Sequence, residues 1–222
     1  MGTEALDLTV AVQDYLKAIY ALESSEERVT TSALAGRMGV SAPSATAMAK
    51  RLAELGLVER AAYRGVALTE EGRRGALEVI RHHRLLERYL VDRLGLSLDQ
   101  VHAEAELLEH ALSEELEAKI DAELGYPTHD PHGDPIPDSE LRVAHGQVRT
   151  LIDLEPGDRV TIARVPDGDP ELLRYLDELG LVPGSEVELV SFAPFAGPVT
   201  VRTGTGEYAI SRELADRISA AA

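Results

Sequence analysis

The feature that most constrains this chain is a series of His and Glu residues at helical spacing within residues 82–110. His83 and Glu87 lie four positions apart in a segment without Gly or Pro until Gly95. After a short break, four more residues recur at i, i+4, i+7 and i+8, namely His102, Glu106, Glu109 and His110. Because an α-helix has 3.6 residues per turn, residues at this spacing share one face. Imidazoles and carboxylates converging from two neighbouring helices predict a divalent-metal site.

The absence of cysteine restricts both the ligands and the fold. The chain has 222 residues and no Cys, so it can form neither a disulfide framework nor a thiolate metal site. Apolar residues make up 44% of the chain but aromatic residues only 4%, so its cores must be built from Leu, Val, Ala and Ile. No run approaches the roughly 20 apolar residues that cross a bilayer, and the N-terminus lacks the pattern of a signal peptide. We therefore expect a cytoplasmic protein with no membrane partner.

The N-terminal third has the order of elements of a winged helix-turn-helix. Apolar spacing, N-cap residues and terminal glycines predict its three helices. They are expected at residues 8–22, 30–39 and 44–55. Two short β-prone runs at residues 57–69, around a turn at Tyr63, Arg64 and Gly65, predict the wing hairpin. This order predicts a DNA-binding domain over residues 1–72.

Charge distribution supports DNA binding in this domain. The net charge is −17, but residues 28–84 hold ten Lys and Arg against five Asp and Glu, a local excess of five positive charges. In this motif the second helix enters the major groove. The residues predicted to approach bases or backbone are Ser41, Pro43, Ser44, Thr46 and Ala47. Those predicted to neutralise phosphates are Lys50, Arg51, Arg60 and Arg64. The small groove-facing residues cannot make bidentate base contacts, so we expect recognition through DNA shape and thymine methyl groups.

Two long helices are predicted next, at residues 69–94 and 98–124. The second carries an apolar stripe distinct from its His and Glu face, formed by Val101, Ala105, Leu108, Leu112, Leu116 and Ile120. Such a helix can pack against a second subunit while it binds metal on its other face. Residues 73–140 are therefore predicted to form a helical metal-binding and dimerisation domain. A homodimer would present two recognition helices about one DNA turn, roughly 34 Å, apart.

The remainder of the chain reads as a linker and a small β domain. Residues 125–139 are rich in Pro, Gly and Asp, and they hold Asp130 and His132 as weaker candidate ligands. Short strands are expected at residues 159–165, 186–192, 198–202 and 207–210, with a helix at 170–179. They predict a small SH3-like β-barrel within residues 141–222. The predicted fold class is mainly α with this small β domain. No phosphate loop, nucleophile elbow or HExxH motif is present, so we do not expect an enzyme.

Several segments together resemble the diphtheria toxin repressor family of metal-dependent regulators, and within it the manganese transport regulators. The matching segments are DYLKAIYALE at residues 14–23, SAPS at 41–44, HRLLERYL at 83–90, VHAEAELLEH at 101–110 and PHGDPIP at 131–137. The segment LGLVPGSEVELV at residues 179–190 resembles the SH3-like domain of the longer members. The similarity covers nearly the whole chain, with the motifs in the family's order.

The resemblance implies two metal sites. The first would use Asp14, Glu106, Glu109 and His110. The second would involve His83, Glu87 and His102, with Asp130 and His132 in the linker segment where some manganese-type members have Cys and His. It leaves open whether Asp167, Asp169 or Glu171 of the C-terminal domain completes this second site. Lys17 stands where two-metal members have a further Glu, which argues against a tightly coupled binuclear site.

The resemblance also indicates the ion and the function. Iron-type members place Met and Cys where this chain has Asp14 and Glu106, and oxygen donors favour the harder Mn²⁺ over Fe²⁺. The predicted function is a manganese-dependent, homodimeric repressor that binds operator DNA of metal-ion transport genes, with Mn²⁺ as co-repressor. Other divalent ions are expected to substitute in vitro.

Three alternatives are left open. One is an iron-dependent repressor of the same family. Another is a metal-dependent hydrolase in which paired carboxylates activate a metal-bound water. The third is a winged-helix regulator of a small organic molecule, with the His and Glu face merely solvated.

Overall fold

The computed structural model describes residues 8–23, 29–61, 65–144 and 149–221, and the chain divides into two compact units. The first unit comprises Met1–His82 and Ser139–Leu141. The second comprises His83–Asp138 and Arg142–Ala222. No helix in the described ranges is long and apolar enough to cross a membrane.

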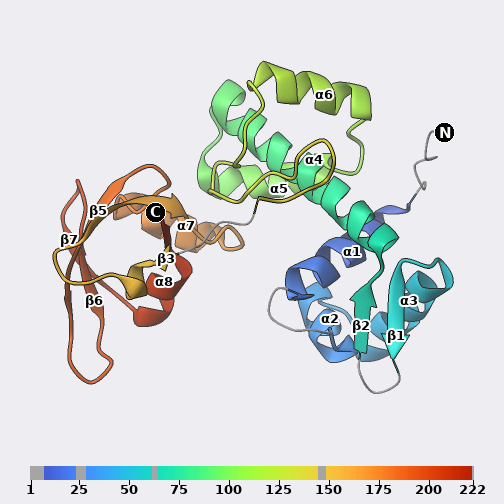
Figure 1. Cartoon of the computed structure of the whole chain (residues 1–222), viewed down its shortest axis with the longest axis horizontal. Coiled ribbons are helices and arrows are strands. Elements are labelled where there is room, and N and C mark those ends of the chain that lie inside the picture. Colours follow the sequence, from blue (N-terminus) through green and yellow to red (C-terminus); the bar gives the residue numbers. More distant parts are fainter. Residues whose placement is uncertain (1–7, 24–28, 62–64, 145–148, 222) are drawn as a thin grey trace. The chain divides into compact units, whose positions relative to one another are not determined.

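The first unit has the predicted winged helix-turn-helix elements (Figure 1). They are α1 (Val10–Glu23), α2 (Thr31–Met38), α3 (Ala42–Glu54), β1 (Val58–Ala61), β2 (Gly65–Leu68) and the start of α4 (Glu70–Leu94). Fully buried leucine and isoleucine side chains form the core of this unit, among them Leu16, Ile19, Leu34, Leu52 and Leu57. This packing confirms that an aliphatic core supports the motif.

Local capping explains why the helix-turn-helix breaks where it does. The Thr30 side chain accepts a hydrogen bond from the backbone N–H of Ala33 at 3.1 Å, which starts α2. Gly39, with φ +64°, ends α2 in the left-handed region. Ser41 then caps α3 by accepting from the N–H of Ser44. Thr30 and Gly39 lie at the predicted ends of the first of these helices, whereas Ser41 caps a helix that begins at Ala42, before the predicted start at residue 44.

The wing is an antiparallel pair of strands, with Val58 opposite Leu68. Gly65 begins β2 with φ +79°, and a Cβ there would lie 2.3 Å from the carbonyl oxygen of Val29. A side chain at this position is therefore excluded. Of the predicted turn, Tyr63 and Arg64 lie outside the described residues.

The helical part of the second unit differs from the prediction at one point. The expected continuous helix at residues 98–124 is wrong, because the structure has α5 (Leu98–Leu108) and α6 (Glu114–Glu123). Ser113 caps the new helix by accepting from the N–H of Leu116 at 3.3 Å. The predicted apolar stripe is divided accordingly, with Val101, Ala105 and Ile120 buried while Leu108 and Leu116 are 44% and 49% exposed.

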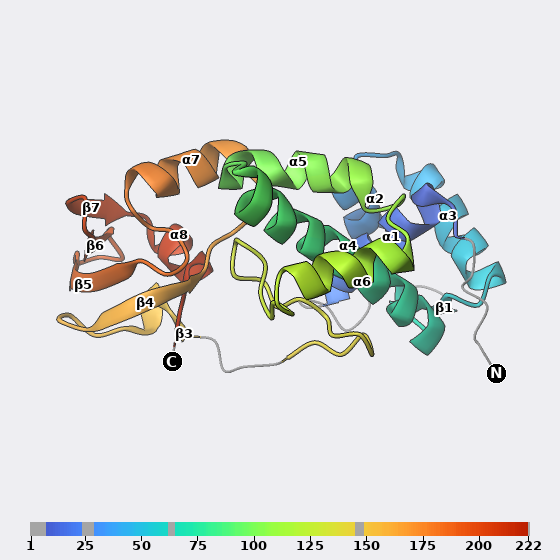
Figure 2. The ribbon, with the colours of Figure 1, turned by 90° about the horizontal axis from the view of Figure 1, so that it is seen from above.

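The C-terminal part of the second unit is a six-stranded antiparallel sheet in the order β3-β8-β4-β5-β6-β7. Its elements are β3 (Arg149–Thr150), η1 (Leu151–Asp153), β4 (Arg159–Arg164), α7 (Pro170–Glu178), β5 (Glu186–Phe192), β6 (Val199–Arg202), β7 (Glu207–Ile210), α8 (Arg212–Arg217) and β8 (Ser219–Ala220). The four predicted strands and the helix are present, and the SH3-like domain is confirmed. The two-residue strands β3 and β8, and α8, were not predicted. Within the second unit, α7 contacts α5, and Figure 2 shows it next to one end of that helix.

Candidate metal centres

Helices α4 and α5 bring three predicted ligands into direct contact. His83 and Glu87 lie one turn apart on α4, with His83 Nε2 2.9 Å from Glu87 Oε1. His102 of α5 reaches both, with its Nδ1 3.1 Å from His83 Nε2 and 3.2 Å from Glu87 Oε1. The helical spacing therefore produced the convergence that it predicted.

The end of α5 adds Glu106, Glu109 and His110 to this region. His102 Nε2 lies 3.9 Å from Glu106 Oε1, and ligand atoms of His83, His102 and Glu106 lie within 4.8 Å of one another. We call these three residues the helix group. Glu109 is fully buried and its Oε2 lies 2.5 Å from His83 Nδ1, while its Oε1 lies 3.4 Å from His110 Nε2. Glu109 and His110 follow the last residue of α5, yet they stay beside the helix group.

A second set of three ligands lies deeper in the same unit. Ligand atoms of Glu87, Asp130 and His132, here called the linker group, lie within 4.8 Å of one another, and all three residues are buried. His132 Nδ1 lies 3.6 Å from Glu87 Oε2. Asp130 and His132, the weaker candidates in the sequence, are thus placed beside a strong one.

The linker group has unsatisfied buried atoms that suit a cation. Glu87 Oε2, Asp130 Oδ2 and His132 Nδ1 have no hydrogen-bond partner within the described parts of the chain. The N–H at His132 Nε2 donates to the carbonyl of Leu98 at 3.0 Å, which directs Nδ1 toward Glu87. Buried polar atoms without partners are costly, and two carboxylate oxygens with one imidazole nitrogen are donors that a divalent ion accepts. These three atoms therefore fit a metal ion.

The linker itself folds into a turn that presents two of these atoms. Asp130 Oδ1 accepts hydrogen bonds from the backbone N–H groups of His132 and Asp134, both at 2.9 Å. The N–H of Asp130 donates to the carbonyl of Asp134, also at 2.9 Å, and Gly133 adopts φ +94°. One carboxylate oxygen of Asp130 therefore holds the turn, which leaves the other for the linker group.

Ionisation in the linker group is strongly coupled to its packing. Burial alone raises the pKa of Glu87, but the adjacent imidazoles of His102, His132 and His83 more than offset this effect and hold its pKa well below the ordinary range. Burial lowers the pKa of His132, but the adjacent Glu87 carboxylate outweighs burial and raises this pKa to about 9. Burial and the negative charge of Glu87 raise the pKa of Asp130 to about 7. Without metal, the His132 imidazole is therefore protonated at neutral pH.

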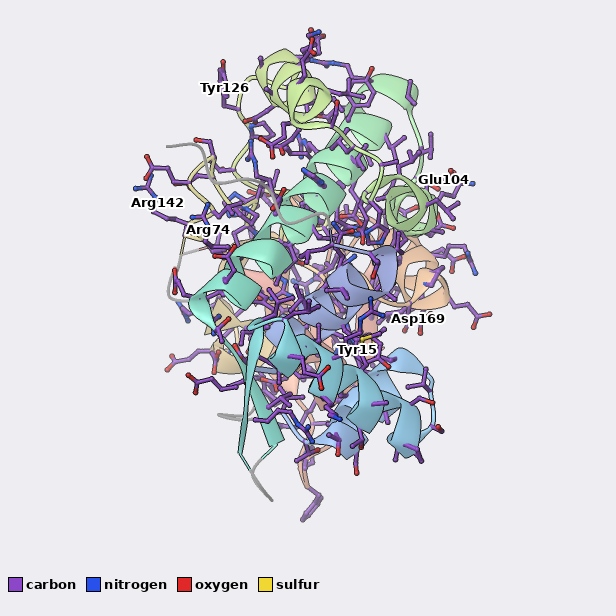
Figure 3. The ribbon with its side chains drawn as sticks, turned by 90° about the vertical axis from the view of Figure 1, so that its right-hand side faces the viewer. Tyr15, Arg74, Glu104, Tyr126, Arg142 and Asp169 are labelled. Carbon is purple, nitrogen blue, oxygen red and sulfur yellow. The ribbon has the colours of Figure 1, made fainter. Side chains whose placement is uncertain are left out.

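Other predicted or neighbouring residues have different surroundings. Asp14 lies on α1 in the first unit and is partly buried, and its role as a ligand stays a prediction. Asp169 caps α7 by accepting from the N–H groups of Glu171 and Leu172, whereas Asp167 is partly buried in the preceding loop. Glu104 is exposed on α5, and Figure 3 labels Glu104 and Asp169. Asp169 therefore already serves as a helix cap.

Sequence analysis did not identify Arg84, which supports the linker turn. Arg84 donates to the carbonyl of Pro135 at 2.6 Å, and its Nη2 lies 3.3 Å from Asp134 Oδ1. Arg84 Nε also lies 3.7 Å from Asp130 Oδ2. Arg84 directly follows His83, but no ligand spacing marks a supporting arginine, and only the fold brings it to the linker.

The candidate DNA-binding residues lie on an exposed face. Ala45, Ala49 and Leu52 of α3 are fully buried. The predicted contact residues around them are exposed, namely Ser41, Pro43, Ser44, Thr46, Ala47, Lys50, Arg51 and Arg60. Arg64 lies outside the described residues. One face of α3 thus belongs to the core, and the other is available to DNA.

Comparison with known sequences covers most of this chain with three domain families. Residues 7–66 match the family described as iron dependent repressor, N-terminal DNA binding domain. Residues 69–138 match iron dependent repressor, metal binding and dimerisation domain. Residues 149–221 match the FeoA domain.

Individual proteins are similar over nearly the full length. The iron-dependent repressor IdeR of Mycobacterium tuberculosis is 32% identical over 232 residues, covering 96% of this chain and 97% of the relative. The diphtheria toxin repressor of Corynebacterium efficiens is 33% identical over 196 residues, covering 83% and 85%. A solved structure of a manganese-dependent transcriptional repressor in complex with manganese has 42% identity and a TM-score of 0.85, covering 95% of this chain and 99% of that chain.

Proposed function

This chain belongs to the diphtheria toxin repressor family of metal-dependent transcriptional repressors, and we propose that Mn²⁺ is the co-repressor that activates it for DNA binding. Members of this family are transcriptional repressors and not enzymes, which argues against the hydrolase alternative. The observation that carries the choice of ion is the donor set. Every predicted ligand is a carboxylate or an imidazole, and the chain has no Cys.

We assign the linker group as the buried metal site. Glu87, Asp130 and His132 would hold the ion through the three buried atoms that lack hydrogen-bond partners. Asp167 is our candidate for a further ligand, because it follows Val165 by two residues and the N–H of Val165 donates to the carbonyl of His132 at 2.9 Å. A bound cation supplies positive charge that neutralises the two buried carboxylates.

The second proposed site follows from the family resemblance. Asp14 of α1 would act with Glu106, Glu109 and His110, as the family resemblance implies. Asp14 falls in the matched DNA-binding domain and the other three in the matched metal-binding and dimerisation domain, so a shared ion would limit how the recognition helix is oriented in the active repressor. The shift toward the DNA-binding arrangement can be no larger than the ion's differential affinity for the two states.

The DNA-binding face would be α3 with the wing. The exposed small residues of α3 would lie in the major groove, and Lys50, Arg51 and Arg60 would contact phosphates. We propose that a homodimer places two such faces on successive turns of operator DNA, and that the regulated genes encode metal-ion transport. Iron is the second candidate ion, because the relative IdeR is named an iron-dependent repressor.

The proposal is tested by fluorescence anisotropy of the full chain with DNA from its own upstream region, at fixed salt. Mn²⁺, Fe²⁺ under anaerobic conditions and Zn²⁺ are titrated against a chelated control. We expect Mn²⁺ to induce binding, and Asp14→Ala to weaken this induction while the protein stays folded and dimeric. Induction by Fe²⁺ alone would reassign the ion. Equal DNA binding with and without any metal would overturn metal control.

A further inference from the structure

The linker turn packs closely against the C-terminal domain through backbone contacts. The N–H of Val165, just after β4, donates to the carbonyl of His132 at 2.9 Å. A Cβ at Gly133 would lie 1.9 Å from the carbonyl oxygen of Ala163, so no side chain fits between the turn and β4. His132, a residue of the linker group, is therefore attached through its own carbonyl to the C-terminal domain.

Asp134 connects the same turn to two arginines from different parts of the second unit. Its side chain is buried, with Oδ1 3.3 Å from Arg84 Nη2 of α4 and Oδ2 3.0 Å from Arg164 Nε of β4. Arg84 also donates to the neighbouring carbonyl of Pro135. A buried carboxylate is stabilised by such charged partners, and Oδ2 makes no hydrogen bond within the described residues, so the ion pair with Arg164 helps to offset its burial.

Displacement of Asp134 would be transmitted to the metal ligands. Its N–H donates to Asp130 Oδ1, and its carbonyl accepts from the N–H of Asp130. The same Asp130 oxygen accepts from the N–H of His132. Asp130, His132 and Asp134 thus form one hydrogen-bonded turn.

We propose that Arg164 is a positioning residue for the buried metal site, acting through Asp134 to hold the linker turn so that Asp130 Oδ2 and His132 Nδ1 face Glu87. The inference rests on the proposed function of the linker group. It assigns the C-terminal domain a part in metal affinity that does not depend on donating a ligand. It also explains why a half-exposed arginine at the end of β4 points its guanidinium at a buried carboxylate of another domain.

The direction of the change in Mn²⁺ affinity distinguishes a positioning role of Arg164 from a purely electrostatic one. Arg164 is positively charged and lies near a proposed cation site, so removing its charge should strengthen cation binding if charge alone matters. If Arg164 holds the turn, its removal should weaken binding, because the ligands lose their preset geometry. Outer residues that orient metal ligands typically contribute about 10–100-fold to metal affinity.

The experiment compares Arg164→Ala with Arg202→Ala in the full chain by calorimetric titration with Mn²⁺. Arg202 is a matched control, because it lies in the same domain, pairs with Glu188 at 2.8 Å, and has the same side-chain exposure of 47%. We expect about tenfold weaker Mn²⁺ binding in Arg164→Ala and no change in Arg202→Ala. Arg164→Lys, which keeps the charge, should fall between wild type and Arg164→Ala. Amide hydrogen exchange should become faster in residues 130–134 of Arg164→Ala alone.

A double-mutant cycle with His132→Ala distinguishes the two ways in which the idea can fail. We expect His132→Ala to remove one Mn²⁺ site, and Arg164→Ala to have no further effect on metal binding in that background. Unchanged Mn²⁺ binding in His132→Ala would overturn the linker group as a metal site, and this inference with it. Loss of the site in His132→Ala, with unchanged or stronger binding in Arg164→Ala, would overturn only the role of Arg164.

Discussion

The helix group and the linker group are alike in size but differ in their environment. Each contains three ligands whose atoms lie within 4.8 Å of one another. In the helix group, the side chains of His102 and Glu106 are 32% and 45% exposed, whereas each residue of the linker group is at most 3% exposed. Water can therefore solvate the helix group without metal, while the linker group leaves three polar atoms without partners. We infer that the buried group gains more from a cation.

The largest expected effect comes from a substitution in the linker group, the more buried of the two groups. Glu87→Gln preserves the shape of the side chain but removes the buried carboxylate that faces His83, His102 and His132. We expect a loss of Mn²⁺ affinity on the order of 100-fold, because a ligand in a water-poor site is replaced by a neutral amide. Calorimetric titration with Mn²⁺ measures the loss.

Two matched variants test whether burial is the cause. Glu106→Gln makes the same change in the half-exposed helix group, and we expect about tenfold weaker binding. Glu104→Gln makes the same substitution at an exposed position of α5 and should leave Mn²⁺ binding unchanged. Equal losses in Glu87→Gln and Glu106→Gln would refute the difference that we infer from burial.

The second prediction concerns protons. Glu87 raises the pKa of His132 to about 9, so at neutral pH the imidazole carries a proton that must leave before Nδ1 can bind a cation. Burial raises the pKa of Asp130 to about 7, so below that pH its carboxyl group must also lose a proton. Mn²⁺ affinity should therefore rise with pH up to about pH 9, by about tenfold per pH unit for each proton displaced.

Titrations in buffers of different ionisation enthalpy count these protons. We expect more than one proton released per ion in the linker group at pH 6, and fewer at pH 9. His102→Ala should keep this release, while His132→Ala should remove its own share. A pH-independent affinity between pH 6 and 9 would contradict the protonation that the Glu87–His132 contact implies.

The same comparison shows what the sequence could predict about the ligands. His83, Glu87, His102 and Glu106 were predicted from spacing because an α-helix converts a period of 3.6 into a face. Asp130 and His132 lie in a Pro- and Gly-rich turn that has no period. Their position depends on tertiary contacts, including the left-handed Gly133 and the carbonyl of Ala163. Spacing could name them as candidates but could not place them beside Glu87, and only the family resemblance put them in the same predicted site.

Periodicity also explains two of the errors in the fold, the continuous helix and the missed short strands. The apolar stripe at residues 98–124 continues across the break after α5, because Leu112 keeps the spacing although it lies outside any helix. The cap at Ser113 was the available signal of a new helix. The strands β3 and β8 have two residues each, which is too short for alternation to be recognised. The longer strands were predicted because their alternation extends over four to seven residues.

The smallest expected effect comes from a substitution on the DNA-binding face, which contains no ligand of either metal group. Arg51 is exposed near the end of α3 and is predicted to contact a phosphate. Arg51→Ala should weaken operator binding severalfold and lower the slope of log affinity against log salt by about 0.9, the value for one phosphate contact. Anisotropy titrations over a range of salt concentrations, at saturating Mn²⁺, measure both quantities. Arg202→Ala, a change of the same charge in the C-terminal domain, is the control and should leave the slope unaltered.

The Mn²⁺ dependence of Arg51→Ala then tests whether the two regions have separate roles. A phosphate contact contributes equally to every DNA sequence and does not touch the metal ligands. The ratio of operator affinity with Mn²⁺ to operator affinity without it should therefore equal that of the wild type. A changed ratio would mean that Arg51 contributes differently in the two metal states. The recognition helix would then take part in the switch itself and would not act only as the surface that the switch orients.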